Sequence, residues 1–265
     1  NRLRGKRYLL TSATDAQPSS DGGLDSYDMD GVTVSGSSAY GLDGSGDSII
    51  NYFFKRYPKV FDVVVYEGNG SNSPFRTINH NLGVAPELVI IKNVDQALHW
   101  GVNQNTGDSD VDGDVLYLNL NGAYSGADGL TASATTVTLN GGWGGTAQTN
   151  GSGDTHLMLM FASLSGISKV GAYTGTGNDL NVTDLGASAR FVLIKRTDAS
   201  GDWYVYDSTS GIVSGNDPYF FINSTAVSVT NTDYIDPHSS GFTITSSAPD
   251  ALNASSGKYL YLALA

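Results

Sequence analysis

"KYLYLALA" (residues 258–265) is an apolar run that decides the fold, because it has two counterparts earlier in the chain. "HLMLMFA" (156–162) and "SIINYFF" (48–54) have the same apolar character, and each follows a similar series of segments. Short runs in which apolar residues alternate or nearly alternate are typical of β-strands. The three runs therefore predict three copies of the closing strand of one repeated β unit.

Further segments recur in the same order, at a spacing of about a hundred residues. The matching pairs are "ELVIIKN" (87–93) with "RFVLIKR" (190–196), "HWGVNQ" (99–104) with "DWYVYD" (202–207), "VLYLNL" (115–120) with "YFFINS" (219–224), and "TTVTL" (135–139) with "GFTIT" (241–245). Runs rich in Val, Ile, Thr, Tyr and Phe alternate with Gly, Asn, Asp and Ser, as strands alternate with turns. Residues 57–163 and 164–265 are predicted to be two tandem, antiparallel, β-sandwich-like repeats in an all-β protein.

Residues 1–56 match only the back half of a repeat. "RYLLTS" (7–12) resembles "YFFINS", "GVTVSG" (31–36) resembles the "GFTIT" segment, and "SIINYFF" resembles the closing strand. The strands of the corresponding front half are expected upstream in a longer polypeptide, from a neighbouring subunit, or from a permuted pairing within this chain.

Charge limits the classes of partner. Fourteen Lys and Arg residues stand against 26 Asp and Glu, which gives a formal net charge of −12. A surplus of negative charge repels phosphate groups, so neither nucleic acid nor an anionic membrane is an expected partner. The sequence contains no Cys, which excludes disulfides and thiolate metal ligands, and no apolar run has the length of about 18 residues that spans a membrane.

One loop has the spacing of a calcium site. Alternate carboxylates precede and follow Gly113, and they belong to Asp108, Asp110, Asp112 and Asp114. Such carboxylates can converge on one hard cation. The bidentate Glu of a calcium-binding helical loop is replaced by Asn119, and a strand is expected to follow. Calcium binding and a solvated acidic hairpin loop both stay open, and no other cofactor is expected.

Three aromatic residues are candidates for ligand binding, because Trp and Tyr stack on sugar rings and bond sugar hydroxyls through their polar tips. Trp143 lies in the Gly-rich loop "NGGWGGTAQTNGSG", while Trp203 and Tyr204 lie in "DWYVYD". Alternation places Trp203 and Tyr204 on opposite faces of a strand. The other interpretation of Trp203, and of its repeat partner Trp100, is that both anchor the core.

No catalytic constellation is evident, so the chain is not expected to be an enzyme. The His residues are scattered, and no nucleophile elbow is present. Asp233 and Asp236 could in principle be a carboxylate pair of the type that a polysaccharide depolymerase uses, but nothing in the sequence indicates a catalytic cleft, and turn capping is the favoured interpretation. The Gly-x-Gly segments "YEGNGSN" and "YTGTGND" lack the following helix of a phosphate loop, and they are predicted to be tight hairpin turns.

The segments "KVGAYTGTGN", "FVLIKRTDASGDWYVYD", "SSGFTITSS" and "SSGKYLYLALA" resemble β-rich tandem repeats of tail and fibre-type virion proteins of tailed phages, particularly marine phages. The likeness covers most of residues 57–265. The resemblance implies location in a virion, at the tail or particle surface, and extracellular exposure. It also implies assembly with copies of itself and with other virion proteins, in a structural role with host-surface glycan contact. The alternative hypothesis is a lectin-like or calcium-stabilised bacterial surface adhesin, motivated by Trp143 and the acidic loop.

Overall fold

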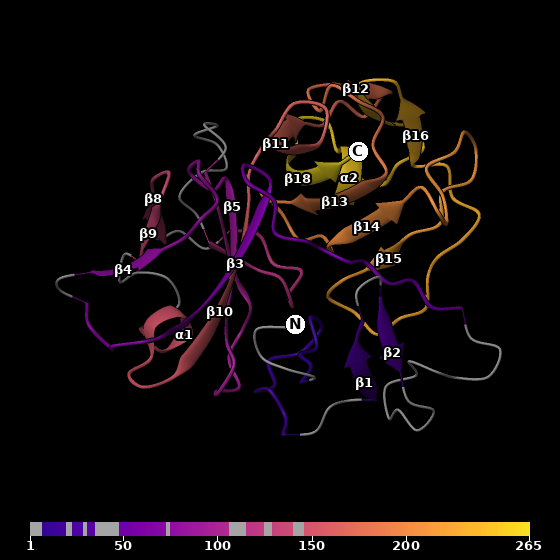
Figure 1. Cartoon of the computed structure of the whole chain (residues 1–265). Coiled ribbons are helices and arrows are strands. Elements are labelled where there is room, and N and C mark those ends of the chain that lie inside the picture. The colour runs from indigo at the N-terminus through magenta and orange to yellow at the C-terminus, as the bar shows by residue number, and fades with distance from the viewer. Residues whose placement is uncertain are drawn as a thin grey trace.

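The computed structural model describes residues 7–19, 23–28, 31–34, 48–72, 75–105, 115–124, 129–139 and 146–265. Figure 1 shows that these residues form several sheets, with two short helices, α1 (Thr146–Asn150) and α2 (Asp250–Asn253). All paired strands are antiparallel. The prediction of an all-β, sandwich-like fold is confirmed.

The first full unit consists of two sheets. Its five-stranded sheet has the order β3 (Phe61–Glu67), β10 (Thr155–Phe161), β5 (Leu88–Asn93), β6 (Gly101–Gln104) and β7 (Val115–Tyr117). Its three-stranded sheet has the order β4 (Arg76–Asn79), β9 (Thr136–Leu139) and β8 (Leu130–Ala132).

The second full unit has the same topology. Its five-stranded sheet has the order β11 (Ser168–Thr174), β18 (Lys258–Leu264), β13 (Phe191–Arg196), β14 (Tyr204–Asp207) and β15 (Phe220–Phe221). Its three-stranded sheet has the order β12 (Leu180–Val182), β17 (Gly241–Ile244) and β16 (Ile235–His238). The apolar closing runs become β10 and β18, and each pairs on both edges, which satisfies the backbone groups of a fully buried strand.

The N-terminal segment, residues 7–56, forms a hairpin of β1 (Leu24–Tyr27) and β2 (Val32–Val34) in its described part. This hairpin corresponds to the β8–β9 and β16–β17 hairpins of the full units. The expected third closing strand is not formed, because residues 48–54 have no ladder partner among the described residues. A strand needs a neighbour to satisfy its backbone hydrogen bonds, and the pattern of its side chains alone does not supply one.

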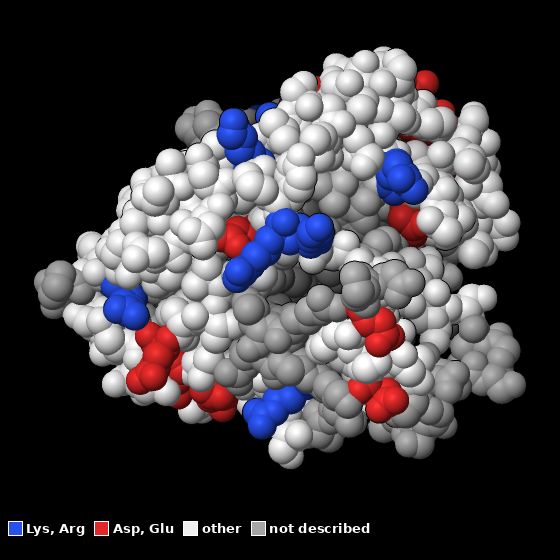
Figure 2. All heavy atoms as spheres, viewed as in Figure 1, with Lys and Arg blue, Asp and Glu red and all other residues white. Residues whose placement is uncertain are grey.

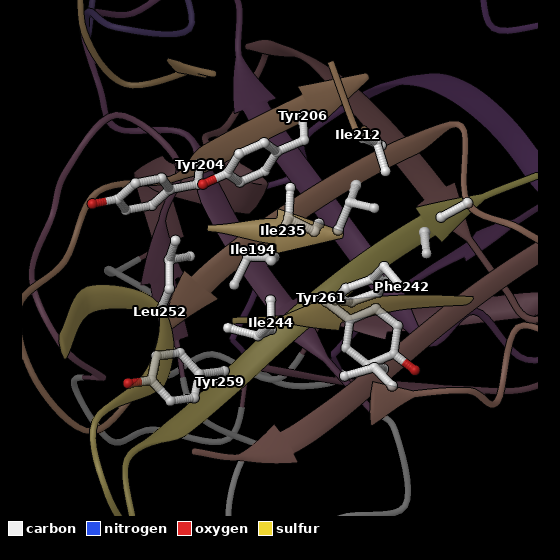
Figure 3. Close-up of a cluster of buried hydrophobic side chains, with 14 of the residues drawn as sticks. Ile194, Tyr204, Tyr206, Ile212, Ile235, Phe242, Ile244, Leu252, Tyr259 and Tyr261 are labelled. Carbon is white, nitrogen blue, oxygen red and sulfur yellow. The ribbon is translucent and has the colours of Figure 1, made fainter. Parts of the chain in front are cut away.

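Each full unit buries a core between its two sheets. In the first unit, Met158 and Met160 of β10 belong to one buried cluster with Ile78 and Val137 from the smaller sheet. In the second unit, aromatic residues fill the equivalent space (Figure 3). They surround Ile194 and Ile244, and include Tyr204, Tyr206, Phe242, Tyr259 and Tyr261.

A third core lies where the two full units and the N-terminal segment meet. Alternate residues on the other faces of the large sheets point into it, including Leu88, Ile90 and Phe161 from the first unit and Leu193, Leu260 and Leu262 from the second. Leu9 and Tyr52 of the N-terminal segment pack against this central core. Both large sheets are therefore covered on both faces, which explains why "LVIIK" and "FVLIK" are continuously apolar up to the Lys.

Candidate functional site

Trp203 joins the second unit to the first. Its side chain is 1% exposed in the central core, and its indole Nε1 donates a hydrogen bond to the carbonyl oxygen of Tyr117 at 3.0 Å. The backbone N–H of Trp203 is held by Asn223 Oδ1 at 3.0 Å, which fixes the residue just before β14. A buried indole N–H needs an acceptor, and here the acceptor belongs to the preceding unit.

Trp100 makes the same contact one unit earlier. Its Nε1 donates to the carbonyl oxygen of Leu10 in the N-terminal segment at 3.0 Å, and its backbone N–H bonds to Asn119 Oδ1 at 3.0 Å. Asn119 and Asn223 are equivalent in the two repeats. The same three-residue arrangement therefore connects the N-terminal segment to the first unit and the first unit to the second.

Backbone hydrogen bonds reinforce both junctions. The Tyr124 N–H donates to the Thr197 carbonyl at 3.0 Å, and the Gly201 N–H donates to the Asn121 carbonyl at 2.9 Å. At the earlier junction, the Gln17 N–H donates to the Val94 carbonyl at 2.7 Å. The segment that follows β7 in the first unit therefore runs past the end of β13 in the second unit. In the same way, the N-terminal segment at Gln17 runs past the end of β5 in the first unit.

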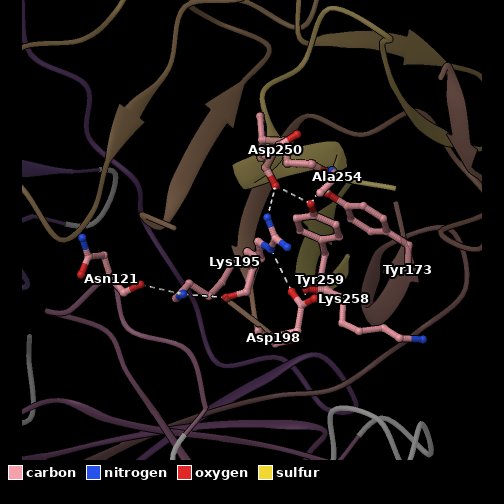
Figure 4. A network of polar contacts seen from close by, with 11 residues as sticks. Asn121, Tyr173, Lys195, Asp198, Asp250, Ala254, Lys258 and Tyr259 are labelled. Atoms are coloured by element: carbon pink, nitrogen blue, oxygen red, sulfur yellow. Dashed lines mark hydrogen bonds and ion pairs between the residues drawn. The ribbon is translucent and has the colours of Figure 1, made fainter. Parts of the chain in front are cut away.

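Two equivalent lysines lie fully buried beside these junctions. Lys195 Nζ donates to the carbonyls of Arg196 at 2.6 Å and Asn121 at 3.3 Å, the second from the preceding unit (Figure 4). Lys92 Nζ donates to the carbonyls of Asn93 at 2.6 Å and Gln96 at 3.0 Å. Burial disfavours the ammonium form and lowers the pKa of each lysine from 10.5 to about 8.

The N-terminal segment also contacts the second unit, so each of the three parts touches the other two. The Tyr52 hydroxyl donates to Asp207 Oδ2 at 2.8 Å, and its ring stacks on Phe220 with 6.2 Å between centroids. Thr11 Oγ1 donates to the Ile222 carbonyl at 2.7 Å. Burial alone would raise the pKa of Asp207, but hydrogen bonds from Ser210, Tyr52 and two backbone N–H groups outweigh it and hold that pKa below its usual value.

The structure corrects two of the predicted ligand-binding residues. Trp203 and Tyr204, which is 6% exposed, occupy the central core and the core of the second unit, respectively. The alternation that placed them on opposite faces is right. Both faces are covered, however, one by the smaller sheet and the other by the neighbouring parts of the chain, so neither ring presents a face on which a sugar could stack.

The remaining predicted site residues lie outside the described residues. They are Trp143 and the calcium candidates Asp108, Asp110, Asp112 and Asp114. Within the described ranges, no group of three or more His, Asp or Glu side chains is arranged to hold a metal ion. The calcium loop and the Trp143 contact stay predictions.

The Gly-x-Gly segments are not the hairpin turns that the sequence predicts, because each follows a strand of the larger sheet (β3 or β11) and leads to a strand of the smaller sheet (β4 or β12). An asparagine in each unit shapes the Gly-x-Gly turn. Asn253 Oδ1 accepts the N–H groups of Thr176 at 3.0 Å and Gly177 at 3.3 Å. Asn150 Oδ1 accepts the equivalent N–H of Asn69 at 3.0 Å. A Cβ on Gly68 or Gly175 would collide with a backbone carbonyl, so the glycines are required for close packing.

Sequence reasoning missed these asparagines and the two buried lysines. The signal for the lysines was present, since "VIIKN" and "VLIKR" place Lys at the same point of an otherwise apolar strand. No local pattern indicated the asparagines, because their partners lie 77 and 81 residues away in sequence.

Charge does not mark a ligand surface on the face in Figure 2, where acidic and basic side chains of the described residues lie in small groups separated by uncharged ones. Arg56 Nε forms an ion pair with Asp62 Oδ1 at 3.0 Å. No helix in the described part of the chain has the length and apolar character needed to cross a membrane.

A family model described as a domain of unknown function, DUF7483, matches residues 1–265. The chain belongs to the DUF7483 family. The match spans the N-terminal segment and both full units, so the DUF7483 domain contains the two Trp junctions and the three cores together. No curated protein and no solved structure matches the chain.

Proposed function

We propose that this DUF7483 chain is a non-enzymatic structural module of a tailed-phage virion, located at the tail or particle surface. In this role it works by packing β units against one another and against copies of itself and other virion proteins. The observation that carries the proposal is the repeated junction, in which the indole of Trp203 or Trp100 bonds to a backbone carbonyl of the preceding part.

Three features support a structural role. The aromatic residues of "HWGVNQ" and "DWYVYD" are used inside the cores, and the two buried lysines bond to backbone carbonyls at or beside the junctions. The Gly-x-Gly turns are filled by Asn150 and Asn253 side chains. Each of these groups takes part in core packing or in hydrogen bonds within the chain, as expected for a rigid structural module.

The test is to find the polypeptide in particles. Phage particles from a host that carries this gene should be purified, dissociated and analysed by mass spectrometry, and antibodies against residues 164–265 should label tails or particle surfaces in electron micrographs. The expected result is a fixed copy number per particle and labelling at one location. Absence of the polypeptide from intact, infectious particles would contradict the proposal.

A further inference from the structure

We propose that the surface formed by β15 and residues 48–54 binds a front half-repeat of the same kind as residues 57–105 and 164–207. This half-repeat carries a Trp whose indole N–H bonds to the Phe221 carbonyl. The two Trp junctions already fill two of three equivalent positions around the central core, and this surface is the third. The inference concerns the occupant of a surface and does not depend on a virion location.

Three backbone carbonyls have equivalent surroundings. The carbonyls of Leu10, Tyr117 and Phe221 each accept a turn hydrogen bond from the backbone N–H of the residue three positions later in the chain. These donors are Ala13 at 3.3 Å, Leu120 at 3.1 Å and Ser224 at 3.3 Å, respectively. The first two carbonyls also accept an indole N–H. Among the described residues, no side chain donates to the Phe221 carbonyl.

The Phe221 carbonyl is directed toward the third position. The Ile222 N–H donates to the Trp203 carbonyl at 3.1 Å, so the adjacent pair, Tyr204 and Phe221, is a non-hydrogen-bonded pair. The carbonyl of such a residue points away from the neighbouring strand, and β15 is the last strand of its sheet. Tyr117 in β7 has the same placement, and there the outward carbonyl is the one that Trp203 bonds.

Residues 48–54 expose the face that a complete unit buries. The turns at 57–61 and 164–168 have the same backbone hydrogen bonds and both precede the first strand of a unit, so Phe54 corresponds to Phe161 and Phe53 to Met160. Phe54 packs against Phe161, as expected for the side that faces the central core. Phe53 is 64% exposed, whereas Met160 is fully buried between the sheets of its unit.

The missing neighbours define the occupant. In the second unit, β18 is flanked by β11 and β13, and Trp203 lies just before β14. The two flanking strands, β11 and β13, and Trp203 with β14 all belong to the front half, residues 164–207. A segment of this type would pair with both edges of residues 48–54, cover Phe53 and Ile49, and bring a Trp to the Phe221 carbonyl.

The experiment is a fusion in which a second copy of residues 164–217 replaces residues 1–6 ahead of Arg7. The splice recreates the order of a complete repeat, since Tyr8 and Tyr219 occupy equivalent positions before the Leu10 and Phe221 carbonyls. Hydrogen exchange should show amides at 49–54 slowed by about tenfold or more relative to the parent chain, as expected for a strand that has joined a cooperative sheet. The melting temperature should rise.

Two further variants keep the test specific. Trp203→Phe in the added copy alone should lose part of the rise in melting temperature while residues 49–54 stay protected. The same copy attached after Ala265 follows the second unit as the second unit follows the first, so it should reach the same position and protect residues 49–54 as well. Fast exchange at 49–54 in the first fusion would overturn the proposal, and so would a parent chain that dimerises with 49–54 already protected, because a second copy would then be the occupant.

Discussion

The indole Nε1 of Trp203 lies 3.0 Å from the carbonyl oxygen of Tyr117, across the boundary between the two full units. Trp100 repeats this relationship with Leu10, at the same distance. A buried side-chain donor that is satisfied only by a neighbouring unit makes the fold of one unit dependent on the presence of the previous one. The units are therefore expected to unfold together.

Trp203→Phe removes the indole N–H and keeps an aromatic ring in the central core. The Tyr117 carbonyl loses a buried donor, so we expect the free energy of unfolding to fall by about 1 to 3 kcal/mol in urea titrations. Trp100→Phe should have a similar effect because its bond is equivalent. Val213→Ala, at a half-exposed site, should change stability by less than about 0.5 kcal/mol. Separate transitions for the two units in the parent chain would contradict the expected coupling.

The strands of the full units could be predicted from the sequence, because alternation and the repeat agree over residues 57–265. The same pattern gave the wrong result for "SIINYFF", which forms no strand in the structure. Its apolar residues match those of β10, but strand formation depends on partners distant in sequence, and those partners are not among the described residues.

The candidate site was predicted less well, for a related reason. Alternation correctly assigned Trp203 and Tyr204 to opposite faces, yet it could not show that another part of the chain covers the second face. Local sequence describes one strand and its two sides, while burial is decided by how whole sheets pack. The contact of Trp143 with a ligand and the binding of calcium at Asp108–Asp114 stay predictions.

Asn253→Ala tests whether the Gly-x-Gly turn is structural. The side chain is 2% exposed, accepts two backbone N–H groups, and donates to the carbonyls of Asn178 at 2.8 Å and Thr245 at 3.2 Å. Losing these partners in the interior should cost about 3 kcal/mol, measured by urea unfolding. Asn181→Ala, at an exposed position, should cost less than about 0.5 kcal/mol. A stability increase of the parent chain with inorganic phosphate would instead favour an anion site at this turn.

Tyr52→Phe tests the contact between the N-terminal segment and the second unit. Removing the hydroxyl deprives Asp207 of one hydrogen bond, so its folded pKa should rise and stability at pH 7 should fall by about 1 kcal/mol. Because the native pKa is depressed, this contribution is present above the unfolded pKa of about 4 and is lost as pH falls through the folded pKa. The urea midpoints of variant and parent should therefore converge in acid. Tyr57→Phe, at an exposed ring, should have the same urea midpoint as the parent at every pH. Equal midpoints for Tyr52→Phe and the parent at pH 7 would show that the Tyr52–Asp207 hydrogen bond does not stabilise the fold.

The buried lysines should give the protein an unusual alkaline dependence of stability. Each has a folded pKa of about 8, against 10.5 for an exposed lysine. Between these values the unfolded chain binds more protons than the folded one, so stability rises with pH. Above about pH 10 the buried tyrosines reverse the trend, because burial raises the pKa of Tyr66 and Tyr261 and only the unfolded chain ionises readily there.

Replacing both lysines with Met removes the two groups that produce this rise. We expect the melting temperature of the parent chain to increase from pH 8 to about pH 9.5 and that of the Lys92→Met, Lys195→Met double variant to stay level, since methionine has no proton to release. Lys169→Met is the matched control, because Lys169 lies partly exposed in an ion pair with Asp184 at 3.5 Å, and it should keep the rise. Calorimetry across this pH range measures all three proteins. A parent chain whose melting temperature falls steadily from pH 8 would show that the two ammonium groups are not penalised by burial, and the carbonyls around Lys92 and Lys195 would then have to stabilise the charged form fully.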